Sequence, residues 1–129
     1  MSGIGIEEIK AKFKTEFGPI ADKFHFYNFD LMDQKNYQGD FIWKPGVYVF
    51  WSPECSVIKV GRHLTNALKR ALEHIRDDTG GEMRSLETDP SARLLLFNVK
   101  DTKDKHWVAA LEIFFELNLK PKIQSGRLG

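Results

Sequence analysis

Five polar side chains, dispersed along the chain, could together hydrolyse a phosphodiester bond, and they belong to Tyr48, Lys59, Arg70, His74 and Glu112. An arginine binds phosphate through a planar fork that stays charged at any working pH. A carboxylate is a usual ligand of magnesium, which commonly accompanies phosphate chemistry. This chemistry requires the five groups to meet in space, so the elements that carry them must be predicted first.

Tyr48 and Lys59 lie on two short apolar runs, 47–51 and 57–60, which we expect to form an antiparallel hairpin. A phenol has a pKa of about 10 and needs help to act as a general base at neutral pH. A nearby ammonium favours the phenolate, provided that the hairpin register places both side chains on one face. The alternative is an ordinary sheet tyrosine whose hydroxyl lies at the rim.

The segment 65–75 predicts an amphipathic helix that Thr65 or Asn66 could cap. Arg70 and His74 are four residues apart, so they lie on one face of this helix. There Arg70 could bind a phosphate, while His74 could hydrogen-bond the tyrosine hydroxyl or the attacking water. The same spacing also fits an ordinary solvated helix face.

Glu112 lies midway along the run 105–118, which is apolar nearly all round and predicts a largely buried helix. Burying a carboxylate is costly unless it is paired, protonated or bound to a metal. Glu112 is therefore either a metal ligand, the partner of an arginine, or a side chain that reaches solvent at the helix rim. Glu116 is one turn closer to the helix end, and we expect it to be solvated.

The remaining segments predict the frame that holds these side chains. Residues 4–17 repeat apolar side chains every three or four positions, which is typical of an amphipathic helix. The segment 20–40 is rich in aromatic residues without a sustained period, so we expect an irregular arm that packs on the core. Residues 92–99 contain a continuous apolar run that predicts a third, fully buried strand. We expect 41–43 to form a short strand and 77–91 a loop.

The composition is that of a folded domain: 129 residues, 42% hydrophobic and 29% charged. We divide the chain into a helix and arm at 1–43, a domain at 44–124 and a tail at 125–129. The net charge of +1 gives no overall basic surface, so nucleic-acid binding would need a local patch. The single cysteine excludes an internal disulfide, and we see neither a signal peptide nor a membrane span, so we expect a cytoplasmic protein. The other histidines and the cysteine have no partners at ligand spacing and receive no role: His25, His63, His106 and Cys55.

The order of these pieces resembles that of the GIY-YIG nuclease family. The chain contains, in the family's order, Gly46-Val47-Tyr48, Lys59-Val60-Gly61, Arg70, His74 and Glu112. The resemblance covers about residues 44–124. It implies an α+β fold with a small three-stranded antiparallel sheet flanked by helices, and hydrolysis of DNA with a divalent cation, Mg²⁺ or Mn²⁺.

The resemblance also implies a role for each matching residue. Tyr48 is the general base, Arg70 binds the scissile phosphate and Glu112 holds the metal. Lys59 stands where the second triplet has tyrosine, and it would tune the phenol together with His74.

Contacts with DNA are expected from Arg62, Lys69, Arg70 and Lys122. The family often has a supporting asparagine near the end of the domain, and Gln124 is its nearest counterpart here. No separate specificity domain is visible, so sequence recognition would come from the N-terminal arm, the loop 77–91, a second copy of the chain or a partner protein.

Two other functions fit the same residues. The fold could persist without catalysis and bind nucleic acid or a protein, which the missing second tyrosine and the small net charge favour. The chain could also be a structural or regulatory module in which Glu112 pairs internally. A structure in which Tyr48, Arg70 and Glu112 do not converge would favour this last function.

Overall fold

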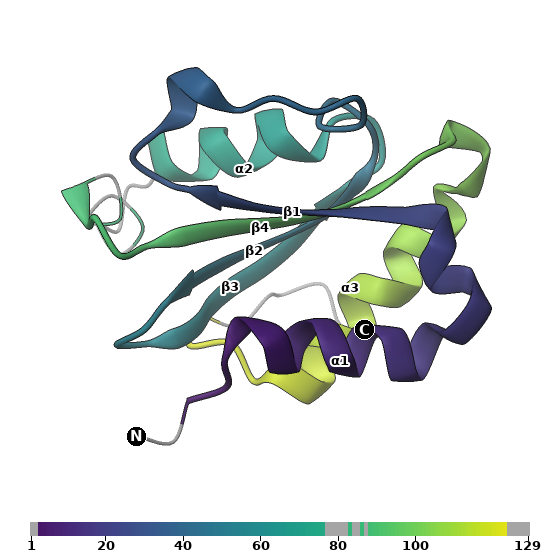
Figure 1. The fold of residues 1–129 in the computed structure, drawn as a ribbon, viewed down its shortest axis with the longest axis horizontal. Helices are drawn as coiled ribbons and strands as arrows, with labels where there is room; N and C mark the ends of the chain where they lie inside the picture. The colour runs from purple at the N-terminus through teal and green to yellow at the C-terminus, as the bar shows by residue number, and fades with distance from the viewer. Residues whose placement is uncertain (1–2, 77–82, 84–85, 87, 124–129) are drawn as a thin grey trace.

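The computed structural model describes residues 3–76, 83, 86 and 88–123, which form an antiparallel sheet covered by helices on both faces (Figure 1). The described elements, in chain order, are α1 (Ile6–Phe17), η1 (Gly18–Lys23), β1 (Phe24–Asp30), η2 (Gln34–Asn36), β2 (Gly46–Ser52), β3 (Ser56–His63), α2 (Ala67–Arg76), β4 (Arg93–Val99), η4 (Thr102–Asp104) and α3 (His106–Leu119). In the sheet, the strands lie side by side in the order β1-β4-β2-β3. Helix α2 covers one face, whereas α1 and α3 cover the other. The predicted α+β class is therefore confirmed.

The segment 20–40, expected to be irregular, contains strand β1. This strand pairs with β4 along its whole length, from Phe24 opposite Val99 to Asp30 opposite Arg93. The sheet therefore has four described strands, rather than the three that the resemblance implies.

The physical reason for this error is that β1 carries aromatic side chains on both of its faces. Phe24 and Phe26 belong to the core under α1 and α3. Tyr27 and Phe29 belong to the core on the α2 side. A strand with apolar side chains on both faces has no regular alternation of apolar and polar residues, so the period of two that predicts a half-buried strand is absent.

Two further expectations concern the loops. Residues 41–43 form a turn instead of the expected strand, because the Lys44 N–H donates to the Phe41 carbonyl at 3.0 Å and reverses the chain before β2. The expected loop 77–91 falls mostly outside the described residues, as do Gln124 and the tail 125–129.

The central strands β2 and β4 supply alternate side chains to two cores. Val47 and Val49 face α1 and α3, whereas Tyr48 and Phe50 face α2. Side chains along β2 therefore alternate between the two cores. This alternation places Tyr48, the catalytic candidate on β2, on the side of α2 and not on the side of α3.

Both ends of the described chain are fastened to the hairpin of β2 and β3. The Ile4 carbonyl accepts a hydrogen bond from Trp51 Nε1 at 2.9 Å and from Ser56 Oγ at 2.7 Å. The backbone N–H groups of residues 122 and 123 donate to the carbonyls of Val57 and Ile58 on β3. The hairpin is thus held from both termini.

Candidate functional site

Tyr48 lies across the neighbouring strand at Gly61. The register pairs these two residues, and the tyrosine side chain is fully buried. A Cβ atom at position 61 would collide with the ring and the hydroxyl of Tyr48. Glycine is therefore the residue that lets the phenol lie over β3.

The register also places Lys59 on the Tyr48 side of the sheet. Lys59 is directly opposite Phe50, and directly opposed residues share a face. Phe50 and Tyr48 share that face because they are two residues apart. The pairing is irregular between Phe50 and Trp51, so alternation along the sequence alone could not predict this register.

Helix α2 brings His74 to Tyr48. Their ring centroids are 5.7 Å apart with an interplanar angle of 46°, and His74 is half-buried. Arg70 lies one turn nearer the helix start and is exposed, with its Nη1 3.5 Å from Glu73 Oε1. The contact with Glu73 is long, so the guanidinium remains accessible to a ligand.

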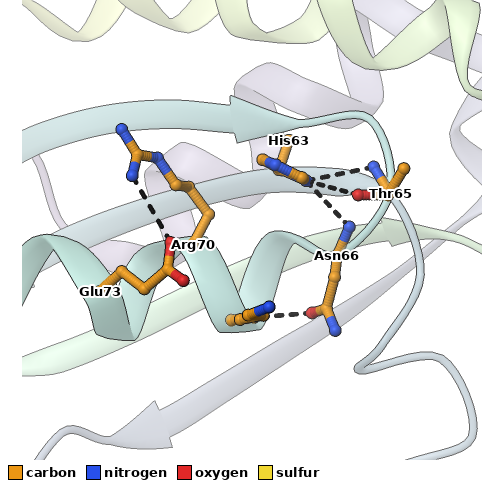
Figure 2. Close-up of polar contacts among 6 residues, drawn as sticks. His63, Thr65, Asn66, Arg70 and Glu73 are labelled. Atoms are coloured by element: carbon orange, nitrogen blue, oxygen red, sulfur yellow. Dashed lines mark hydrogen bonds and ion pairs between the residues drawn. The ribbon is translucent and has the colours of Figure 1, made fainter.

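His63 fixes the corner between β3 and α2, as Figure 2 shows. Its Nδ1 accepts hydrogen bonds from the backbone N–H groups of Thr65, at 3.2 Å, and Asn66, at 3.0 Å. The Thr65 hydroxyl lies 2.9 Å from the same nitrogen. Because backbone N–H groups can only donate, Nδ1 acts as the acceptor for both of them.

Asn66 caps α2, as one of the two predicted caps. Its Oδ1 accepts from the backbone N–H of Lys69 at 3.0 Å. His63, by contrast, received no role from the sequence, because histidine is not a usual capping residue and the spacing of its partners gives no signal. His63 and Asn66 together stabilise the first turn of α2, which carries Arg70.

Glu112 is on the other face of the sheet, where it forms an ion pair with Arg62. Arg62 is opposite Val47, so its side chain projects toward α3. Glu112 is only 2% exposed, and the arginine provides a charged hydrogen-bonding partner for its Oε1. Pairing with an arginine is one of the three alternatives that the sequence left open for Glu112.

Glu116 was expected to be solvated, and this prediction was wrong. Its exposed fraction is 3%. Helix α3 continues to Leu119, and both Leu119 and Pro121 are buried, so the last turn is covered rather than exposed. Helix α3 therefore carries two buried carboxylates one turn apart.

Glu112 and Glu116 are the carboxylates that could bind the divalent cation implied by the resemblance. Across the described residues, no three His, Cys, Asp or Glu side chains gather where they could share a metal ion. Magnesium at a phosphate site needs only one or two carboxylates, since phosphate oxygens and waters complete its shell. The donor chemistry of Glu112 and Glu116 fits that requirement, although a cation would compete with Arg62 for Glu112.

The predicted site residues form two groups, one on each face of the sheet. Tyr48, Lys59 and His74 are on the α2 side, and Glu112 is on the α3 side. Consecutive residues of β3 separate the groups, because Gly61 underlies Tyr48 on one face and the next residue, Arg62, contacts Glu112 on the other. Tyr48, Arg70 and Glu112 therefore do not converge on one face, which is the arrangement that favours a structural or regulatory module with an internally paired Glu112.

The predicted DNA contacts do not all lie together. Lys69 and Arg70 are exposed on the first turn of α2, close to the end of β3 that carries Arg62. The backbone of Lys122 is bonded to Val57, near the opposite end of β3. Lys122 is therefore separated from the other three cations.

No family model matches the chain, and neither the comparison with curated proteins nor that with solved structures gives a match. The resemblance to the GIY-YIG family is thus carried by the motif residues alone. Within the ranges that the structure covers, no helix has both the length and the hydrophobicity of a membrane span.

Proposed function

We propose that this chain is a GIY-YIG-like, metal-dependent endonuclease that hydrolyses phosphodiester bonds of DNA. The observation that carries the proposal is the placement of Gly61 beneath Tyr48, with Arg62 beside it on Glu112. These two consecutive residues face opposite sides of β3, which is an edge strand of the sheet, so the proposal requires the scissile phosphate to contact Arg70 and the cation on Glu112 across this edge. Arg70 is accessible on the adjacent helix.

In this proposal the residues of the α2 side handle protons and phosphate. Tyr48 is fully buried, so we assign the exchange of its proton with solvent to His74, which is half-buried and packs against the phenol. Lys59 favours the phenolate from the same face of the sheet. Arg70 binds the scissile phosphate through its guanidinium.

On the α3 side, Glu112 and Glu116 would hold the cation. A bound Mg²⁺ or Mn²⁺ would supply charge stabilisation for the leaving oxygen. Arg62 orients the Glu112 carboxylate through their ion pair when no cation is present.

A plasmid assay tests the proposal. The full chain is incubated with supercoiled plasmid and Mg²⁺ or Mn²⁺, beside Arg70→Ala, Glu112→Ala and the control Lys14→Ala, an exposed position on α1. We expect nicking by the wild type and by Lys14→Ala, with a rate about 100-fold lower for the other two variants. Absence of cleavage under all conditions, or cleavage that survives Glu112→Ala, would contradict the proposal.

Thermal melts separate a lost site from a lost fold. Arg70 is exposed, so Arg70→Ala should melt at the wild-type temperature. Glu112→Ala leaves Arg62 without its carboxylate and should melt lower. Loss of cleavage in Arg70→Ala therefore reports on the site itself.

The Arg62–Glu112 ion pair favours a second candidate, a GIY-YIG-like module that binds nucleic acid or protein without cleaving. In such a module the pair is structural, and Arg62 already fills the place of the cation. Calorimetric titration with Mn²⁺ distinguishes the two. Heat of binding that disappears in Glu112→Gln supports the nuclease, whereas no heat with a normally folded wild type supports the binding module.

A further inference from the structure

One corner of the molecule, where the turn before β2 meets the start of α2, combines two exposed apolar side chains with two exposed cations and the half-buried Lys44. We call it the Trp43 corner, and it consists of Trp43, Lys44, Leu64, Lys69 and Arg70. Trp43 is 60% exposed and Leu64 is 41% exposed. The other two tryptophans are half-buried, and one of them, Trp51, donates its indole N–H to Ile4.

Backbone contacts hold the parts of this corner together. The Lys44 carbonyl accepts from the Ala67 N–H at 3.3 Å, which joins the turn that carries Trp43 to the first residue of α2. The same carbonyl accepts from Asn98 Nδ2 at 3.0 Å, so the turn is also fixed to β4. A hollow lined by residues 62–65 lies beside it. Trp43 is thus presented from a fastened turn rather than from a free loop.

The charge at the corner suits a polyanion. Lys44, Lys69 and Arg70 are all cationic, and the amino end of α2 adds partial positive charge. Of the nearby carboxylates, Glu73 contacts Arg70 only at 3.5 Å, and Asp40 lies in the turn that precedes Trp43. The balance is a local basic patch on a chain whose net charge is only +1.

Exposure of apolar side chains alone would not identify a nucleic-acid contact. Ile113 and Leu117 are also exposed, at 44% and 60%, but they lie on α3, which covers the opposite face of the sheet. Neither is aromatic. The Trp43 corner differs because an indole, which can stack on a base, is carried by a turn bonded to the start of α2, the helix that carries two exposed cations able to bind phosphates.

We propose that Trp43 stacks on an unpaired base of a nucleic-acid strand whose phosphates contact Lys44, Lys69 and Arg70. This inference builds on the proposed function, since Arg70 belongs to both, and it names the form of the substrate: DNA with unpaired bases next to the cleaved bond. A base inside a regular duplex has both faces covered by its neighbours and is not available to the indole. A single-stranded or branched substrate supplies such a base.

Binding without cleavage tests this inference. Fluorescence anisotropy with a labelled 15-nucleotide single strand and the matching blunt duplex, both in EDTA, measures affinity for the wild type, Trp43→Ala and Trp43→Phe. Leu117→Ala is the matched control, because it removes an equally exposed apolar side chain from the other face. Thermal melts of all variants confirm folding.

We expect the wild type to prefer the single strand and Trp43→Ala to bind it about tenfold more weakly, in line with the typical effect of removing a stacking aromatic residue. Trp43→Phe should retain most of the affinity, and Leu117→Ala all of it. Quenching of tryptophan fluorescence by the single strand should fall in Trp43→Phe, because the quenched indole is absent.

The inference would be overturned if the wild type and Trp43→Ala bound the single strand equally well, or if Trp43→Ala weakened binding to the blunt duplex by the same factor. Absence of binding to either oligonucleotide would also overturn it, and would indicate that the Trp43 corner binds a protein partner instead. The outcome is distinguishable from failure of the proposed function. Binding that depends on Trp43 in a chain that never cleaves plasmid supports the inference and refutes only the nuclease. Cleavage that is unaffected by Trp43→Ala on single-stranded and branched DNA refutes only the inference.

Discussion

At the scale of single residues, the motif glycine and the motif tyrosine form one steric unit. Gly61 provides the space that the Tyr48 ring occupies, so the pair is needed for packing whether or not the chain cleaves DNA. The same holds for Arg62 and Glu112, whose contact accommodates a buried carboxylate. Motif residues in this chain therefore have structural roles that a loss of activity alone would not separate from catalysis.

The steric unit predicts the effect of a single methyl group. Gly61→Ala should lower the free energy of unfolding by about 1–3 kcal/mol, because the new Cβ forces the phenol or the strand to move. Urea denaturation measures the change. Gly5→Ala is the control, since a Cβ at Gly5 meets nothing within 4 Å, and it should stay within about 0.5 kcal/mol of the wild type. Gly61→Ala with wild-type stability would show that Tyr48 does not need this space.

At the scale of elements, features that depend on a local sequence pattern were predicted correctly, whereas features that depend on contacts between distant segments were not. The helix at residues 65–75 was predicted from its apolar period and its cap, and Asn66 does cap α2. Strand β1 was missed because its aromatic residues serve both cores. The face of Lys59 was not predictable, because the irregular pairing between Phe50 and Trp51 is a property of two strands together.

The candidate site was also predictable only in part from the sequence. The sequence placed His74 on the helix that packs on Tyr48, and their rings do meet. It could not choose among the three alternatives for Glu112, because the partner, Arg62, comes from a distant strand. It also gave Glu116 the wrong environment, since burial of the last turn of α3 depends on segments packed around it.

The corner between β3 and α2 carries a prediction at this scale. His63→Ala removes the acceptor of two backbone N–H groups, so it should destabilise the start of α2 by about 0.5–2 kcal/mol, the usual cost of losing a cap. Amide hydrogen exchange measures this, with faster exchange expected in the first turn of α2 than in β4. His63→Asn, which keeps an acceptor, should lie between Ala and wild type. Unchanged exchange in His63→Ala would mean that these bonds contribute little.

At the scale of the whole molecule, the sheet separates two cores, and the N-terminal third of the chain contributes to both. Helix α1 supplies Ile9 and Phe13 to the core shared with α3. Strand β1 supplies Tyr27 and Phe29 to the core on the α2 side. The part that resembles the nuclease family, about 44–124, is therefore covered on both faces by residues that precede it.

This arrangement predicts that residues 44–129 alone do not fold to the native state. Without residues 1–43, strand β4 loses the partner that pairs with it over its whole length. The core under α3 loses three buried side chains, Ile9, Phe13 and Phe24, each worth roughly 1.5–3 kcal/mol when buried. That loss is comparable with the 5–15 kcal/mol by which whole domains are stable. Circular dichroism and a thermal melt of residues 44–129 should show no cooperative transition. A cooperative melt near that of the full chain would instead make 44–124 an independent domain, with the N-terminal third as an attachment to it.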